Sequence, residues 1–113
     1  MMNATNATRL EKIEAMLVDS PHDTFLRYGL AMELEKAGRH AESLQGLQSL
    51  MADATPYVPA FFMAAQHLVR QGRINEARGY LRSGIEEARR RGDAHAAGEM
   101  SEMLASLGEL GES

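Results

Sequence analysis

The sequence contains no cysteine, and this absence excludes a disulfide framework, a thiolate zinc site and a cysteine nucleophile. Long hydrophobic runs are also missing, because no stretch approaches the roughly 18 apolar residues of a membrane-spanning helix. The first 20 residues carry neither the charged leader nor the apolar run of a signal peptide. We therefore expect a cytoplasmic protein with no membrane partner.

The charge balance argues against a nucleic-acid partner, because the formal net charge of the 113 residues is −4. Residues 70–91 carry seven arginines and three glutamates, but arginines near the end of a helix complement its dipole. Residues 93–113 carry five acidic residues and neither lysine nor arginine. The two segments are expected to neutralise one another or to form a charged end together, and we expect no nucleic-acid partner.

Valine, isoleucine and threonine are scarce, whereas alanine, leucine, methionine, glutamate and arginine are abundant, which favours helices throughout the chain. Thr8 and Glu11 have the spacing of a capping box at the start of the first helix. Prolines and glycines divide the rest of the chain, and Gly108 is expected to end the last helix. The six helices are predicted at about residues 8–18, 24–37, 40–52, 59–71, 75–91 and 93–107.

The chain repeats itself with a period of 34 residues, and a fixed period in this range is typical of a helical solenoid. The pair Gly38-Arg39 recurs as Gly72-Arg73. The same offset joins Ala31 to Ala65, Leu34 to Leu68, Glu42 to Glu76, Leu47 to Leu81 and Ser49 to Ser83. Small residues at such positions let paired helices approach closely, while the leucines fill the space between them.

These repeats resemble the tetratricopeptide repeat family, whose motif reads W-x2-L-G-x2-Y, A-x3-F and P, and in particular its short stand-alone bacterial members. The first repeat supplies Arg27, Leu30, Ala31, Leu34, Ser43 and Leu47, and the second supplies Phe61, Ala64, Ala65, Leu68, Ala77 and Leu81. The resemblance implies an all-α, right-handed α-solenoid of about six helices in antiparallel hairpins. The expected domain covers residues 8–108, between a disordered N-terminus (1–7) and a flexible tail (109–113). Within it we expect a half-repeat (8–23), two repeats (24–57 and 58–91) and a capping helix (93–108).

Candidate chemistry is sparse along the chain. His95 and Glu99 have metal-ligand spacing on one helix, but two ligands do not make a site. The serines occur at helix caps or inside helices, and none lies in a strand-turn-helix elbow of the G-x-S-x-G type. We therefore expect no metal, no cofactor and no enzymatic activity.

The resemblance places a peptide-binding groove on the first helix of each hairpin, and we expect a protein or peptide partner there. Apolar anchoring is expected from Phe25, Tyr28, Met32 and Phe62, and Gln66 shares this face, while Lys36, Arg70 and Glu102 would set orientation by charge. The same aromatic residues are equally compatible with packing in the core. The alternative function is self-assembly into homo-oligomers, through open apolar faces at Leu10, Ile13 and Leu17 or at Met100, Met103 and Leu107.

Overall fold

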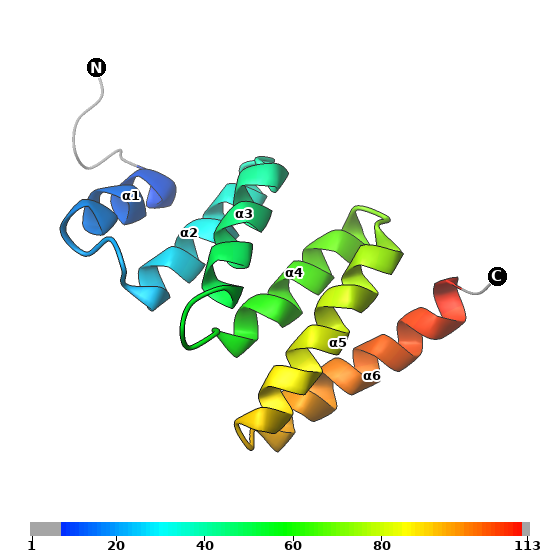
Figure 1. Ribbon diagram of the computed structural model, residues 1–113. Helices are drawn as coiled ribbons and strands as arrows, with labels where there is room; N and C mark the ends of the chain where they lie inside the picture. The colour runs from blue at the N-terminus through cyan, green and yellow to red at the C-terminus, as the bar shows by residue number, and fades with distance from the viewer. Residues whose placement is uncertain (1–7, 112–113) are drawn as a thin grey trace. The chain divides into compact units, whose positions relative to one another are not determined.

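The chain is all-helical over the residues that the structure describes. This computed structural model describes the backbone of residues 8–111 and the side chains of residues 8–108, with no strand in that range (Figure 1). Its helices are α1 (Arg9–Asp19), α2 (Thr24–Lys36), α3 (His40–Met51), α4 (Val58–Arg70), α5 (Ile74–Arg90) and α6 (Ala94–Gly111). The predicted all-α class is confirmed, and every predicted boundary except the end of α6 lies within one residue of the observed one.

The chain divides into two compact units. Unit 1 ends at Leu50 and contains α1, α2 and nearly all of α3, whereas unit 2 begins at Met51 and contains α4, α5 and α6. The single domain over residues 8–108, with its repeats at 24–57 and 58–91, stays a prediction. Residues 1–7, expected as a disordered N-terminus, lie outside the described residues.

The C-terminal helix runs further than the sequence predicts. Gly108 is expected to end it, but α6 continues to Gly111, so the predicted helix end is wrong. The flexible tail expected over residues 109–113 stays a prediction, and residues 112–113 lie outside the described residues. A glycine ends a helix when it adopts a positive φ, and Gly108 is not among the glycines that do so. Inside a helix, glycine costs only about 1 kcal/mol relative to alanine, which the rest of α6 offsets.

Unit 1 begins with the capping box predicted from its sequence. The backbone N–H of Glu11 donates to the Thr8 hydroxyl at 3.1 Å, and the Thr8 backbone N–H donates to the Glu11 carboxylate at 3.1 Å. This backbone hydrogen bond stabilises the ionised carboxylate and lowers the pKa of Glu11. Helix α1 then packs against α2, and its Ile13 side chain is buried.

Two hairpin turns, 34 residues apart, have the same geometry. Gly38 and Gly72 adopt φ values of 80° and 77°, a left-handed conformation that favours glycine. The N–H of the following arginine donates to a carbonyl five positions back, at 2.9 Å for Arg39 and 2.8 Å for Arg73. This is the Schellman arrangement, which satisfies carbonyls at the end of a helix. The glycine-arginine pairs that recur in the sequence therefore form turns of the same backbone geometry.

Each of these arginines also clamps a glutamate in the first turn of the next helix. Arg39 donates two hydrogen bonds to the Glu42 carboxylate, both at 2.8 Å, and Arg73 donates two to Glu76, at 2.8 and 2.7 Å. The bidentate contact lowers the pKa of Glu42 and of Glu76 and raises the pKa of both arginines. The turn and the start of the helix after it are thus fixed together.

A buried hydroxyl joins α2 to α3. The Ser43 hydroxyl donates to the Ala31 carbonyl at 2.6 Å, and both residues are fully buried. The helices are close here, since a Cβ added at Gly46 would lie 3.6 Å from the Ala31 Cβ. The hydroxyl thus holds the hairpin at the point where small side chains allow it to close.

We expect Ser43→Ala to lower the free energy of unfolding by about 1 kcal/mol, because it removes one buried hydrogen bond without leaving a large cavity. Urea denaturation monitored by circular dichroism measures the change. Ser49→Ala is the matched control: its hydroxyl accepts a hydrogen bond from Arg27 at 2.8 Å on an exposed surface, and its loss should cost less than about 0.5 kcal/mol. Equal losses for the two variants would contradict the assigned role of Ser43.

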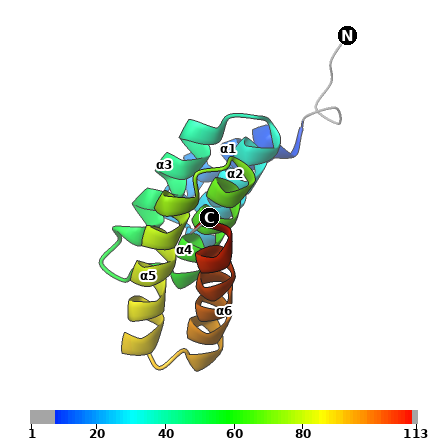
Figure 2. The same cartoon turned by 90° about the vertical axis from the view of Figure 1, so that its right-hand side faces the viewer.

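Unit 2 is a three-helix layer in which α5 packs against both α4 and α6 (Figures 1 and 2). The three helices meet at Gly84, where an added Cβ would lie 2.6 Å from the Met100 sulfur and 2.6 Å from the Phe61 Cβ. Alanine and leucine fill the rest of the layer. The buried apolar residues of the unit include Ala60, Ala64, Ala65, Leu68, Ala77, Leu81, Ile85, Ala88, Ala97 and Leu107.

Candidate binding surfaces

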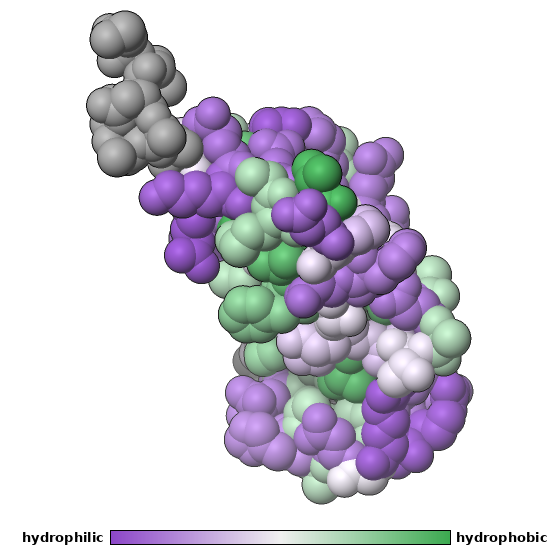
Figure 3. All heavy atoms as spheres, turned by 90° about the vertical axis from the view of Figure 1, so that its left-hand side faces the viewer, coloured by the Kyte–Doolittle hydropathy of each residue, from purple (hydrophilic) through white to green (hydrophobic). Residues whose placement is uncertain are grey.

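Unit 1 contains an apolar hollow between α1 and α2. Its volume is about 390 Å³. We call it the α1–α2 hollow, and it is lined by Arg9, Lys12, Ile13, Met16, Phe25, Leu26, Tyr28, Gly29 and Met32. On this side of the molecule, apolar side chains of unit 1 reach the surface among charged ones (Figure 3). Three of the predicted binding residues, Phe25, Tyr28 and Met32, are brought together here.

Helical spacing explains why these side chains share one wall. Phe25, Tyr28 and Met32 follow one another at intervals of three and four residues, so they project from the same face of α2. Gly29 lies within this stripe, and a Cβ added there would be 3.5 Å from the Ile13 side chain of α1. The absence of a side chain at Gly29 therefore leaves space above Ile13 and helps to form the hollow.

Exposure distinguishes an anchor from a core residue in this wall. The Phe25 side chain is 77% exposed, so it does not pack in the core, which was the other possibility left by the sequence. Met16, on the opposite wall, is 48% exposed, while Tyr28 and Met32 are half-buried. The exposed phenylalanine and the flexible methionines beside it form an apolar surface. Covering this surface with an apolar group of a partner would lower the free energy of the complex.

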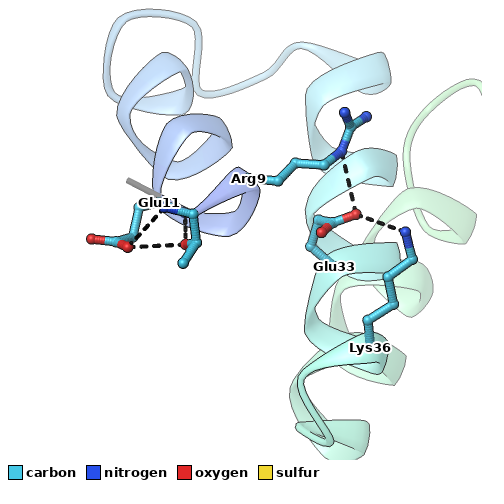
Figure 4. Close-up of polar contacts among 5 residues, drawn as sticks. Arg9, Glu11, Glu33 and Lys36 are labelled. Carbon is cyan, nitrogen blue, oxygen red and sulfur yellow. Dashed lines mark hydrogen bonds and ion pairs between the residues drawn. The ribbon is translucent and has the colours of Figure 1, made fainter. Parts of the chain in front are cut away.

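The rim of the hollow is basic. The Arg9 Nε lies 3.3 Å from one carboxylate oxygen of Glu33, and the Lys36 Nζ lies 3.2 Å from the same oxygen (Figure 4). One carboxylate therefore serves two cations. Lys12 adds a further positive charge to the lining. Lys36, expected to orient a partner, thus lies in unit 1 near this rim but not in the lining of the hollow.

The other predicted site residues lie in unit 2. Phe62 is half-buried and lines a smaller hollow of about 150 Å³ together with Val58, Pro59, Asp93, Ala96, Glu99 and Met100. Gln66 is half-buried on α4, whereas Arg70 and Glu102 are exposed. The structure therefore places Phe62 in a different hollow from Phe25, Tyr28 and Met32.

The sequence reading missed the contribution of α1 to the hollow. Arg9, Lys12, Ile13 and Met16 recur at helical spacing, which was the available signal. The sequence pattern predicts instead that Leu10, Ile13 and Leu17 form an open apolar face. Ile13 is in fact buried against α2, and Leu10 and Leu17 are half-buried.

The prediction of an open apolar face on α6 is also wrong. Met100 and Leu107 are only 1% and 2% exposed, because both pack inside unit 2, and Met103 is half-buried. These side chains are already covered within one copy of the chain. Self-assembly through them would require unit 2 to open, and homo-oligomerisation itself stays a prediction.

Charged pairs in unit 2 are mostly local. Arg90 and Arg91 donate to the buried Glu87 carboxylate at 2.7 and 2.8 Å, within α5. The His95 and Glu99 side chains do meet, at 3.1 Å, but on an exposed face of α6. Among the described residues, no three acidic or histidine side chains are grouped closely enough to hold a metal ion. Nor does any helix there combine the length and apolar character needed to cross a membrane.

Comparison with known proteins gives a fold relative. No protein-family model matches the chain, and no curated protein matches it. It is similar to the solution structure of protein BPP2914 from Bordetella parapertussis, a structural-genomics target, with a TM-score of 0.75 and 28% sequence identity. The alignment covers 91% of this chain and 90% of that one. The all-helical fold is therefore shared with an experimentally determined structure.

Proposed function

We propose that this protein is a non-catalytic interaction module of the tetratricopeptide type, which binds a helical or extended segment of a partner protein at the α1–α2 hollow. The observation that carries this proposal is Phe25, which is 77% exposed beside an apolar hollow. Phe25 is not an isolated exposed residue, because Met16, Leu26 and Met32 line the same hollow, and a contiguous apolar surface of this kind is typical of an interaction site. We therefore propose that the apolar anchors of the adaptor lie in unit 1.

The hollow suits one large apolar side chain of a partner. Its volume of about 390 Å³ falls at the lower end of ligand-site volumes. Met16 of α1 and Met32 of α2 both line it and can adapt their rotamers to the shape of an inserted side chain. Phe25 would cover that side chain from the edge, and aromatic residues are enriched among interface hot spots.

We expect Phe25→Glu to weaken binding by at least about 30-fold, roughly 2 kcal/mol, because it removes an anchor and places a carboxylate at an apolar contact. The probe is a helical peptide selected from a phage-displayed library on the wild-type protein, with binding measured by fluorescence anisotropy. Methyl NMR of the methionines gives a second readout: Met16 and Met32 should shift on binding, and the buried Met100 should not.

Val18→Glu is the matched control for this experiment. Val18 is 80% exposed on α1 and does not line the hollow, so the same charge is added to an equally exposed apolar site. Circular dichroism checks that both variants remain folded. If the two variants bind the peptide equally well, or if Met16 and Met32 do not shift, the hollow is not the binding site.

A further inference from the structure

A shallow, open groove lies on the surface of unit 2, between α5 and α6. We call it the α5–α6 groove. It has a volume of about 400 Å³ and is lined by Arg82, Ile85, Arg89, Ser101, Leu104 and Ala105. None of these residues belongs to the α1–α2 hollow or to the set that the sequence singled out for binding. The groove combines an apolar floor with two guanidinium groups.

The two arginines of the groove differ from their neighbours on α5 in having no partner among the side chains that the structure describes, residues 8–108. Arg78 donates to the Leu107 carbonyl at 2.7 Å, and Arg90 and Arg91 are held by Glu87. Arg82 and Arg89, by contrast, form neither a hydrogen bond nor an ion pair within the part of the chain that the structure describes. No described side chain therefore makes a direct contact that neutralises either charge.

The spacing of these arginines defines what they can hold. Arg82 and Arg89 are seven positions apart, which places them on one face of α5 with about 10 Å between them along the axis. Ile85 lies between them and is buried, so it forms the floor, while Leu104 and Ala105 of α6 form the opposite wall. Two positive charges thus flank an apolar strip.

The described acidic residues near the groove form no ion pair with Arg82 or Arg89. Glu86 follows Ile85 on α5 and is exposed, but it is not part of the groove lining and makes no ion pair with either arginine. On α6, Glu102 follows Ser101 and is also outside the lining. No carboxylate among the described residues lines the groove itself.

We propose that the α5–α6 groove binds an acidic segment of a partner protein, in which carboxylates about two helical turns apart flank an apolar side chain. Each guanidinium would pair with a carboxylate, and the apolar side chain would cover Ile85 and Leu104. A nucleic acid would use the charges but leave the apolar strip uncovered, so the chemistry of the floor favours a peptide. This site does not depend on the α1–α2 hollow.

The test uses two synthetic helical peptides that differ only in charge. One carries two glutamates seven positions apart with leucine between them, and the other carries glutamines at the same two positions. We expect the glutamate peptide to bind the full chain and the glutamine peptide to bind at least about tenfold more weakly. Binding of the glutamate peptide should also weaken as salt is raised.

Variants locate the binding within the protein. Arg82→Gln and Arg89→Gln should each weaken binding of the glutamate peptide by about three- to tenfold. Arg90→Gln makes the same charge change on α5, outside the groove, and should have little effect. Phe25→Glu should leave binding of the glutamate peptide unchanged. A failure of the α5–α6 groove proposal can therefore be distinguished from a failure of the α1–α2 hollow proposal.

Three outcomes of the peptide experiments would overturn the inference, and a fourth comes from a nucleic-acid probe. The glutamate peptide fails to bind, or the glutamine peptide binds equally well, or Arg90→Gln weakens binding as much as Arg82→Gln. A labelled single-stranded RNA oligonucleotide serves as the competing probe. If it binds more tightly than the glutamate peptide and loses affinity in Arg82→Gln and Arg89→Gln, the groove is a nucleic-acid site instead.

Discussion

Leu81→Ala is expected to lower the free energy of unfolding of this protein by about 3 kcal/mol, and Leu47→Ala by a similar amount. Both leucines are fully buried, and they occupy equivalent positions of the 34-residue period, one in each unit. The cost combines the lost transfer free energy of the side chain with the cavity that remains. Denaturation in urea, followed by circular dichroism, measures it.

Val18→Ala provides the control for the two leucines. Val18 is 80% exposed, so its truncation should change the stability by less than about 0.5 kcal/mol. The comparison also tests the equivalence of the repeats. A loss at Leu47 below about 1 kcal/mol, with the expected loss at Leu81, would show that unit 1 does not pack as the structure indicates.

Gly84→Ala is expected to destabilise the protein by about 2 kcal/mol, although alanine is intrinsically the better helix former by about 1 kcal/mol. The new Cβ would lie 2.6 Å from the Phe61 Cβ and 2.6 Å from the Met100 sulfur. The methionine can rotate away, but the Cβ of Phe61 is attached directly to the backbone of α4. The helices must therefore move apart, which loosens the packing of unit 2.

Gly79→Ala, five residues earlier on α5, is the matched control and should have the opposite sign. An added Cβ at Gly79 meets nothing within 4 Å, so the helix-propensity gain of about 0.5–1 kcal/mol is not opposed. Thermal and urea denaturation of the two variants give the comparison. Stabilisation by both substitutions would mean that α4, α5 and α6 are not in close contact at Gly84.

The helices could be predicted closely because their signals are local. The capping box of Thr8 and Glu11 and the glycines at positions 38, 72 and 92 act over one helical turn, and all three of these glycines have a positive φ. Gly108 is also a glycine near the expected end of a helix, but it lies inside α6. A glycine shows that a left-handed conformation is allowed, whereas packing beyond it decides whether the helix continues.

The candidate site was predicted less completely, for a physical reason. Periodicity groups residues of one helix, so Phe25, Tyr28 and Met32 were correctly placed together on α2. It does not determine which neighbouring helix faces them, and the contribution of Met16 and Lys12 from α1 was therefore missed. The proposal for the α5–α6 groove depends on which arginines have a partner within the described residues. These partners are set by the folded structure and cannot be read from the sequence.

The repeated turn at Gly38-Arg39 and Gly72-Arg73 has a consequence for how such a chain can change in length. All of its bonds, from the carbonyl five positions back to the glutamate clamp, lie within a few residues on either side of the glycine. A tandem duplication or deletion of one 34-residue period with breakpoints inside the turn regenerates an intact turn at the new junction. A chain longer or shorter by one such period would therefore keep the hydrogen bonds that cap each of these hairpin connections.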